Sequence, residues 1–155
     1  MSASTASSTR SAADDPPAVS LYVDSSALVR RYLHDRHRPL VLEAMGADDA
    51  WCASALVRSE AQLALHRAAV TSRQQRELWR VLRDEWEAFW VVPLDDRGMA
   101  RAIELGATYG LRIVDAIHLA AADRLPAPVR YLTFDRHQIP AAAALGFEVL
   151  SPLEA

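Results

Sequence analysis

The sequence predicts an α/β fold, a three-layer α/β/α sandwich with a central parallel sheet. The prediction rests on short runs of apolar and β-branched residues that alternate with longer segments whose apolar residues recur at helical spacing. The first strand is expected at residues 19–23 and the clearest later one at 129–133. Because the chain has 155 residues, 51% of them hydrophobic, it can bury one core without disulfides or metal ions to hold it together.

Residues 1–17 contain almost nothing large and apolar, so we expect a disordered tail there, followed by a single domain over residues 18–155. The first strand is apolar on both faces, as in a buried parallel sheet, and Ser25 is expected to cap the helix that follows it. Prolines at helix starts and glycines at helix ends mark several later boundaries. The later elements are expected, in chain order, as a helix over 39–46, a strand over 50–53, a helix over 55–70, a long helix capped by Thr71, a strand over 90–93, helices from Asp95 toward Gly110 and over 113–123, the strand over 129–133, an alanine-rich helix that ends at Gly146 and a strand over 147–150.

The long helix after Thr71 carries six large apolar residues at helical spacing. They supply more aromatic surface than one helix of a small domain normally buries. We therefore expect some of them to pack in the core and the rest to form a protein interface. The six residues are Leu78, Trp79, Leu82, Trp86, Phe89 and Trp90.

Composition excludes several classes of protein. The net charge of −3 provides no overall basic field, so a nucleic acid would have to be bound locally. All 17 basic residues are arginines, and each can bind a phosphate through two hydrogen bonds. The single cysteine, Cys52, is expected to be a buried thiol of a reducing compartment, without a catalytic role. No apolar stretch suits a membrane span and no signal peptide is evident, so we expect a cytoplasmic protein. Glycine-rich phosphate loops, G-x-S-x-G and clustered cysteines do not occur in the sequence.

Four carboxylates occur where surface charge is not expected. Asp24 and Asp135 come just after predicted strands, at the sheet edge where α/β folds bind ligands, and Glu60 and Asp115 lie within apolar helical stretches. Burying a lone carboxylate costs several kcal/mol unless a cation or hydrogen-bond donors compensate for it. A hard divalent cation such as Mg²⁺ or Mn²⁺, which prefers oxygen ligands, is one such partner.

Four motifs surround these acids in a fixed order along the chain. They read YVDSSAL at 22–28, SE at 59–60, LRIVDAIHLA at 111–120 and TFDR at 133–136. Together they resemble the ordered motifs of PIN-domain ribonucleases, with the VapC toxin group as the nearest match, over about residues 20–152. The resemblance implies a PIN-like three-layer α/β/α sandwich with the acids at the carboxyl ends of its parallel strands.

The resemblance also implies a function. It implies an endoribonuclease that hydrolyses RNA with Mg²⁺ or Mn²⁺, and a toxin of a type II toxin–antitoxin pair. A VapB-like antitoxin would cover the acidic groove, and the toxin would form a homodimer. The catalytic and metal-binding residues would be Asp24, Glu60, Asp115 and Asp135, with the hydroxyl of Ser26 assisting at the metal.

The residues leave some alternatives open. Arg112 lies on the same helical face as Asp115, where it could bind substrate phosphate or balance the acidic charge. We interpret His118, one turn after Asp115, as structural and leave it out of the catalytic set. Two rival functions also remain: a catalytically inactive domain of the same fold that binds RNA or protein, and a nuclease or phosphatase that acts on DNA or other phosphates through the same acids.

Overall fold

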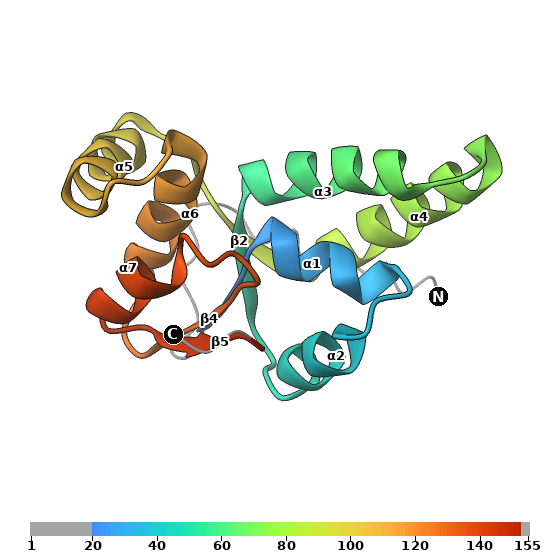
Figure 1. The fold of residues 1–155 in the computed structure, drawn as a ribbon, viewed down its shortest axis with the longest axis horizontal. Helices are drawn as coiled ribbons and strands as arrows, with labels where there is room; N and C mark the ends of the chain where they lie inside the picture. The colour runs from blue at the N-terminus through green and yellow to red at the C-terminus, as the bar shows by residue number, and fades with distance from the viewer. Residues whose placement is uncertain (1–19, 153–155) are drawn as a thin grey trace, which may run out of the picture.

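The structure is a computed structural model that describes residues 20–152 as a five-stranded parallel sheet with helices on both faces (Figure 1). The strand order is β3-β2-β1-β4-β5, and every neighbouring pair is parallel, which confirms the predicted fold class. The central strand is therefore β1. The strands are β1 (Ser20–Val23), β2 (Trp51–Ser54), β3 (Phe89–Val92), β4 (Val129–Leu132) and β5 (Glu148–Leu150).

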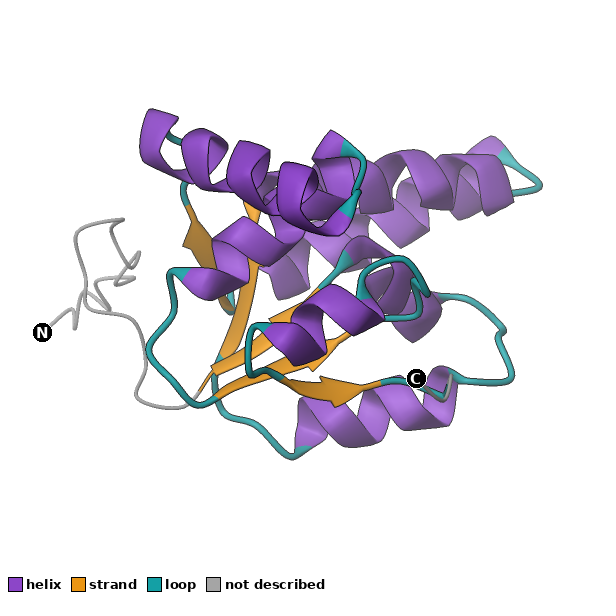
Figure 2. Cartoon of the chain, turned by 60° about the vertical axis from the view of Figure 1, so that its left-hand side comes forward, coloured by secondary structure: helices purple, strands orange, loops and turns teal. Residues whose placement is uncertain are grey.

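The helices form the two outer layers. In Figure 1, α1 to α4 lie on the right of the sheet and α5 to α7 on its left. Figure 2, turned by 60°, shows the strands enclosed between helices of both layers. The helices are α1 (Ser25–Tyr32), α2 (Arg38–Gly46), α3 (Ala55–Ala68), α4 (Ser72–Trp86), α5 (Asp96–Tyr109), α6 (Ile113–Asp123) and α7 (Ile139–Ala144).

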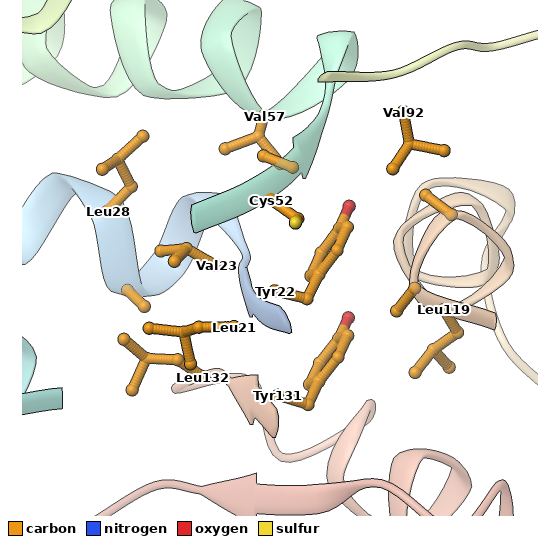
Figure 3. Packing of buried hydrophobic residues seen from close by; sticks show 14 of the residues in the cluster. Leu21, Tyr22, Val23, Leu28, Cys52, Val57, Val92, Leu119, Tyr131 and Leu132 are labelled. Atoms are coloured by element: carbon orange, nitrogen blue, oxygen red, sulfur yellow. The ribbon is translucent and has the colours of Figure 1, made fainter. Parts of the chain in front are cut away.

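The two faces of β1 form the centre of the core. All four of its residues are buried, as expected for the central strand of a parallel sheet. Leu21 and Val23 point toward α1 on one face of the sheet, whereas Tyr22 points toward α6 on the other, together with Tyr131 of β4 (Figure 3). The tyrosine hydroxyls thus lie inside the layer between the sheet and α6.

The aromatic residues around α4 are used mainly in packing. The helix ends at Trp86, so Phe89 and Trp90 belong to β3 and not to the predicted helix. Leu82, Trp86 and Phe89 are buried, and the other three lie half-buried against the core. These six residues therefore leave little exposed apolar surface for the expected protein interface.

Two expectations concern the ends of the chain and the membrane. The predicted disordered tail at residues 1–17 lies outside the described residues, and the single domain over 18–155 stays a prediction. None of the described helices combines the length and the apolar character that crossing a membrane would require.

Candidate functional site

One cleft of about 300 Å³ collects the four acids that the sequence singles out. Asp24 follows β1, Asp135 lies in the loop after β4, Glu60 belongs to α3, and Asp115 lies in the first turn of α6. The ends of β1 and β4 meet here, because the N–H of Asp24 donates to the carbonyl of Leu132. The cleft is lined by Asp24, Ser25, Ser26, Glu60, Arg112, Val114, Asp115, His118, Asp135 and Gln138.

Asp24, and not Ser25 as predicted, caps α1. Its backbone is extended, with φ −82° and ψ 170°, and its Oδ1 accepts a 3.0 Å hydrogen bond from the N–H of Ala27. Aspartate and serine are both good caps, so the sequence pattern could not decide between them. Ser25 is instead the first residue of the helix, and its hydroxyl donates a 3.1 Å hydrogen bond to Glu60 Oε1.

Asp24 is a buried carboxylate held by neutral hydroxyls. Ser26 donates a 2.6 Å hydrogen bond to its Oδ1, and Thr133 donates one of 2.7 Å to its Oδ2. The residue is only 1% exposed, and no described arginine or histidine forms an ion pair with it. Burial raises the pKa of Asp24, opposed by the electrostatic interaction with His118 and by these hydrogen bonds. A bound cation would stabilise its charged form.

Asp115 and Asp135 are linked through one amide. Gln138 Nε2 lies 3.2 Å from Asp115 Oδ1 and 3.4 Å from Asp135 Oδ2, so the buried side-chain amide lies between the two carboxylates. Asp115 is 3% exposed, and its Oδ2 lies 3.4 Å from Nε of the exposed Arg112. Asp135 also accepts a hydrogen bond from the backbone of His137, which holds the loop after β4.

Glu60 is held by a buried histidine. His118 Nε2 lies 2.5 Å from Glu60 Oε1, and its Nδ1 lies 3.2 Å from the hydroxyl of Tyr22. The hydroxyl oxygen of Tyr22 accepts a 3.3 Å hydrogen bond from the N–H of Ser54. His118 is 1% exposed, so it bonds to both neighbours inside the protein and reaches the cleft at its Nε2 edge.

A second tyrosine supports Gln138 in the same way. The Tyr131 hydroxyl donates a 2.6 Å hydrogen bond to Gln138 Oε1. Tyr22 and Tyr131 are partners in the β1–β4 register, and their rings stack at 5.2 Å with an interplanar angle of 2° (Figure 3). Burial raises the pKa of both hydroxyls, so both keep their protons.

The structure brings together all six residues that the sequence named, including Ser26 and Arg112. Sequence reasoning missed Gln138 and Thr133, and it treated His118 as structural only. Thr133 and Gln138 lie two residues before and three after Asp135, a proximity that could have drawn attention to them. Their roles depend on contacts across the sheet, which no local pattern reveals.

The donor set fits a divalent cation that keeps part of its water shell. The four carboxylates line one cleft, yet among residues 20–152 no three acidic, histidine or cysteine side chains converge closely enough to chelate an ion together. Mg²⁺ typically takes one or two carboxylates directly and keeps several waters, so a spread of this kind suits it. Buried Asp24, which has no basic partner among the described residues, provides the charge that such an ion would neutralise.

Comparisons with known proteins agree with the motifs. Residues 21–145 match the family model described as PIN domain. No curated protein matched the chain.

Two solved structures are similar to the fold. One is a toxin–antitoxin complex from Klebsiella pneumoniae, with a TM-score of 0.62 and 20% identity, covering 87% of this chain and 99% of that one. The other is FitAcB from Neisseria gonorrhoeae, with a TM-score of 0.68 and 15% identity, covering 85% of this chain and 97% of that one. At these identities the likeness establishes the shared fold.

Proposed function

The chain belongs to the PIN-domain family, and from this premise we propose that it is a Mg²⁺- or Mn²⁺-dependent endoribonuclease, the toxin of a toxin–antitoxin pair. The observation that carries the proposal is the cleft itself. Four carboxylates from four separate segments line it, and Asp24 and Asp115 are almost fully buried there. Burying two acids in one cleft costs stability, and such a cost is typical of a site kept for binding a cation.

Asp24 and Asp115, together with Glu60 or Asp135, would hold one or two metal ions. A divalent cation at this place supplies Lewis-acid chemistry, which activates water and neutralises charge that develops on the phosphate. Neighbouring residues of the protein hold these carboxylates in place. Hydrogen bonds from Ser26 and Thr133 keep both oxygens of Asp24 fixed, and Gln138 keeps Asp115 and Asp135 apart.

Arg112 is the residue we assign to substrate. Its side chain is 79% exposed at the cleft, and its ion pair with Asp115 is long, at 3.4 Å. An exposed guanidinium at the rim can bind a phosphate of the RNA through two hydrogen bonds. The overall charge of −3 makes such local binding necessary.

Digestion of matched RNA and DNA strands tests the activity. Purified protein is incubated with each strand in Mn²⁺, in Mg²⁺ and in EDTA. We expect the RNA to be cut at internal positions only when a metal ion is present. Preferential cutting of DNA would instead support a DNA-directed nuclease, and cutting in EDTA would contradict metal dependence.

We propose an antitoxin protein as the partner, acting on a cytoplasmic toxin that forms a homodimer. One of the similar solved structures is a toxin–antitoxin complex. A VapB-like antitoxin chain would cover the acidic cleft, where an arginine would find four carboxylates. Expression of the gene alone should inhibit growth, and co-expression of its neighbouring small gene should relieve the inhibition. Normal growth with soluble protein present would count against a toxin.

A second candidate is a catalytically inactive domain of the same fold that binds RNA or protein. Titration of the metal-free protein with Mn²⁺ in a calorimeter separates the two. Heat of binding and a rise in melting temperature support the nuclease, and neither would appear for an inactive relative.

A further inference from the structure

We propose that His118 and Gln138, each anchored on one of two stacked tyrosines, are positioning residues that set the affinity of the cleft for its divalent cation. Neither residue is assigned a contact with the reacting phosphate. His118 contacts the carboxylate of Glu60, and Gln138 contacts those of Asp115 and Asp135. Each of the two residues also forms a hydrogen bond with a tyrosine hydroxyl of the central sheet. The inference rests on the proposed function, because the carboxylates that it concerns are the proposed metal ligands.

The first of the two chains of hydrogen bonds runs from β2 to Glu60. The N–H of Ser54 can only donate, so the oxygen of Tyr22 accepts there and its single proton is free for His118 Nδ1. A carboxylate can only accept, so His118 Nε2 is the donor to Glu60 Oε1, at 2.5 Å. The last donor of this chain of hydrogen bonds points at a carboxylate of the cleft.

The second chain runs from β4 to two carboxylates. The Tyr131 hydroxyl donates to Gln138 Oε1 at 2.6 Å, which orients the amide so that Nε2 faces Asp115 and Asp135. Gln138 is 2% exposed, so solvent does not compete for these bonds. The amide thus fixes one oxygen of each acid against the same nitrogen.

The two chains share a rigid base. Tyr22 and Tyr131 occupy paired positions on neighbouring strands, both are fully buried, and their rings are nearly parallel. Figure 3 shows both rings on the face of the sheet toward α6, with their hydroxyls pointing the same way. Burying these polar groups gains less stability than apolar side chains of the same size would. Holding the two residues that contact the acids is a reason for the protein to keep these hydroxyls in spite of the lost stability.

Replacement of His118 separates positioning from packing. In His118→Gln the amide nitrogen takes the place of Nε2, so the donor to Glu60 is kept. In His118→Asn the amide reaches only the place of Nδ1, so the contact with Tyr22 is kept and the donor to Glu60 is lost. Because loss of an outer partner typically weakens metal binding about 10- to 100-fold, we expect that loss of Mn²⁺ affinity in His118→Asn, and most of the affinity retained in His118→Gln.

The tyrosines are tested by removing one oxygen each. Tyr22→Phe and Tyr131→Phe keep the stacked rings and break one chain apiece, so each should weaken Mn²⁺ binding. Tyr32→Phe is the matched control, because its hydroxyl also bonds a carboxylate, that of Glu85, but away from the cleft. It should bind Mn²⁺ as the wild type does. Circular dichroism establishes that each variant is folded, and the tyrosine variants remain informative if His118→Asn does not fold.

Calorimetric Mn²⁺ titration of the wild type and these variants gives distinguishable outcomes. Wild-type binding with weaker binding in His118→Asn, Tyr22→Phe and Tyr131→Phe supports the inference. Wild-type binding with unchanged affinity in folded variants overturns the inference and leaves the proposed function standing. Equal loss in His118→Gln and His118→Asn also overturns it, because only the packing of the ring would then matter. Absence of wild-type binding overturns the proposed function and the inference together.

Discussion

The hydroxyl of Ser26 lies 2.6 Å from Asp24 Oδ1 and accepts a 2.9 Å hydrogen bond from the N–H of Phe134. One side chain thus joins the end of the central strand, the first turn of α1 and the loop after β4. The acid at the centre of the cleft is consequently held by segments more than 100 residues apart in the sequence. Its surroundings are preorganised, although they contain no basic group that pairs with it among the described residues.

Replacing Asp24 with asparagine should stabilise the metal-free protein. Burial raises the pKa of Asp24, which means that its surroundings favour an uncharged group. The amide keeps the shape and the cap on α1, so we expect a higher melting temperature than that of the wild type in EDTA. The wild type should gain about 2.7 kcal/mol at a Mn²⁺ concentration 100 times the dissociation constant, and the variant much less. A variant less stable than the wild type in EDTA would disprove this reading of Asp24.

Thr133→Val should destabilise the protein by about 1–3 kcal/mol, the cost of leaving buried polar groups without a partner. The threonine is fully buried, donates to Asp24 and accepts the N–H of Asp135. Valine keeps the shape and removes both bonds. Urea unfolding followed by circular dichroism measures the change, with Thr108→Val as a control because that threonine is exposed on α5. Equal unfolding midpoints for Thr133→Val and the wild type would show that these bonds contribute nothing.

The sequence predicted the sheet and the acids for one physical reason. Buried parallel strands are mostly apolar, so Asp24 and Asp135 stood out just after two such strands. Asp115 stood out in the same way on a helix whose other residues are mostly apolar. The carboxyl ends of parallel strands share one sheet edge, which predicts that Asp24 and Asp135 meet there. The resemblance to PIN-domain ribonucleases added Glu60 and Asp115 to the cluster, and all four acids line one cleft.

The sequence could not reveal the hydrogen bonds that hold the acids in place. The bond from Tyr22 to His118 spans 96 residues, and the bond from His118 to Glu60 spans 58. Hydrophobic periodicity treats a buried tyrosine or histidine as a core residue, whichever way its polar end points. The same limit explains the error at Ser25, where two adjacent residues suit a helix cap equally well and only the backbone angles decide.

Arg112→Ala should raise KM several-fold and leave kcat and stability nearly unchanged. The side chain is exposed and its ion pair with Asp115 is long, and surface pairs contribute at most about 1 kcal/mol. Steady-state kinetics on an RNA oligonucleotide and a thermal melt measure these effects. A fall in kcat with KM unchanged would show that Arg112 acts on the acidic cluster and not on substrate.

The products should carry 5′-phosphate and 3′-hydroxyl ends. Water that attacks the phosphorus does not need the ribose 2′-hydroxyl, whereas histidine-driven cleavage uses that hydroxyl and leaves a 2′,3′-cyclic phosphate. His34 and His137 do not line the cleft, and His118 is already bonded on both nitrogens. An RNA with one 2′-deoxy substitution at the mapped site should still be cut in Mn²⁺. Protection by the deoxy substitution would favour the histidine route.

The rate at which folded Asp24→Asn cuts RNA in Mg²⁺, compared with the wild type, tests the central claim most directly. The substitution removes one negative charge from the cleft and keeps the helix cap, and the melting curve establishes that the variant is folded. Because metal activation contributes several kcal/mol to such reactions, we predict a loss of about 100-fold or more. Cleavage at the wild-type rate would contradict the metal-dependent mechanism and the roles proposed for Asp24, Glu60, Asp115 and Asp135.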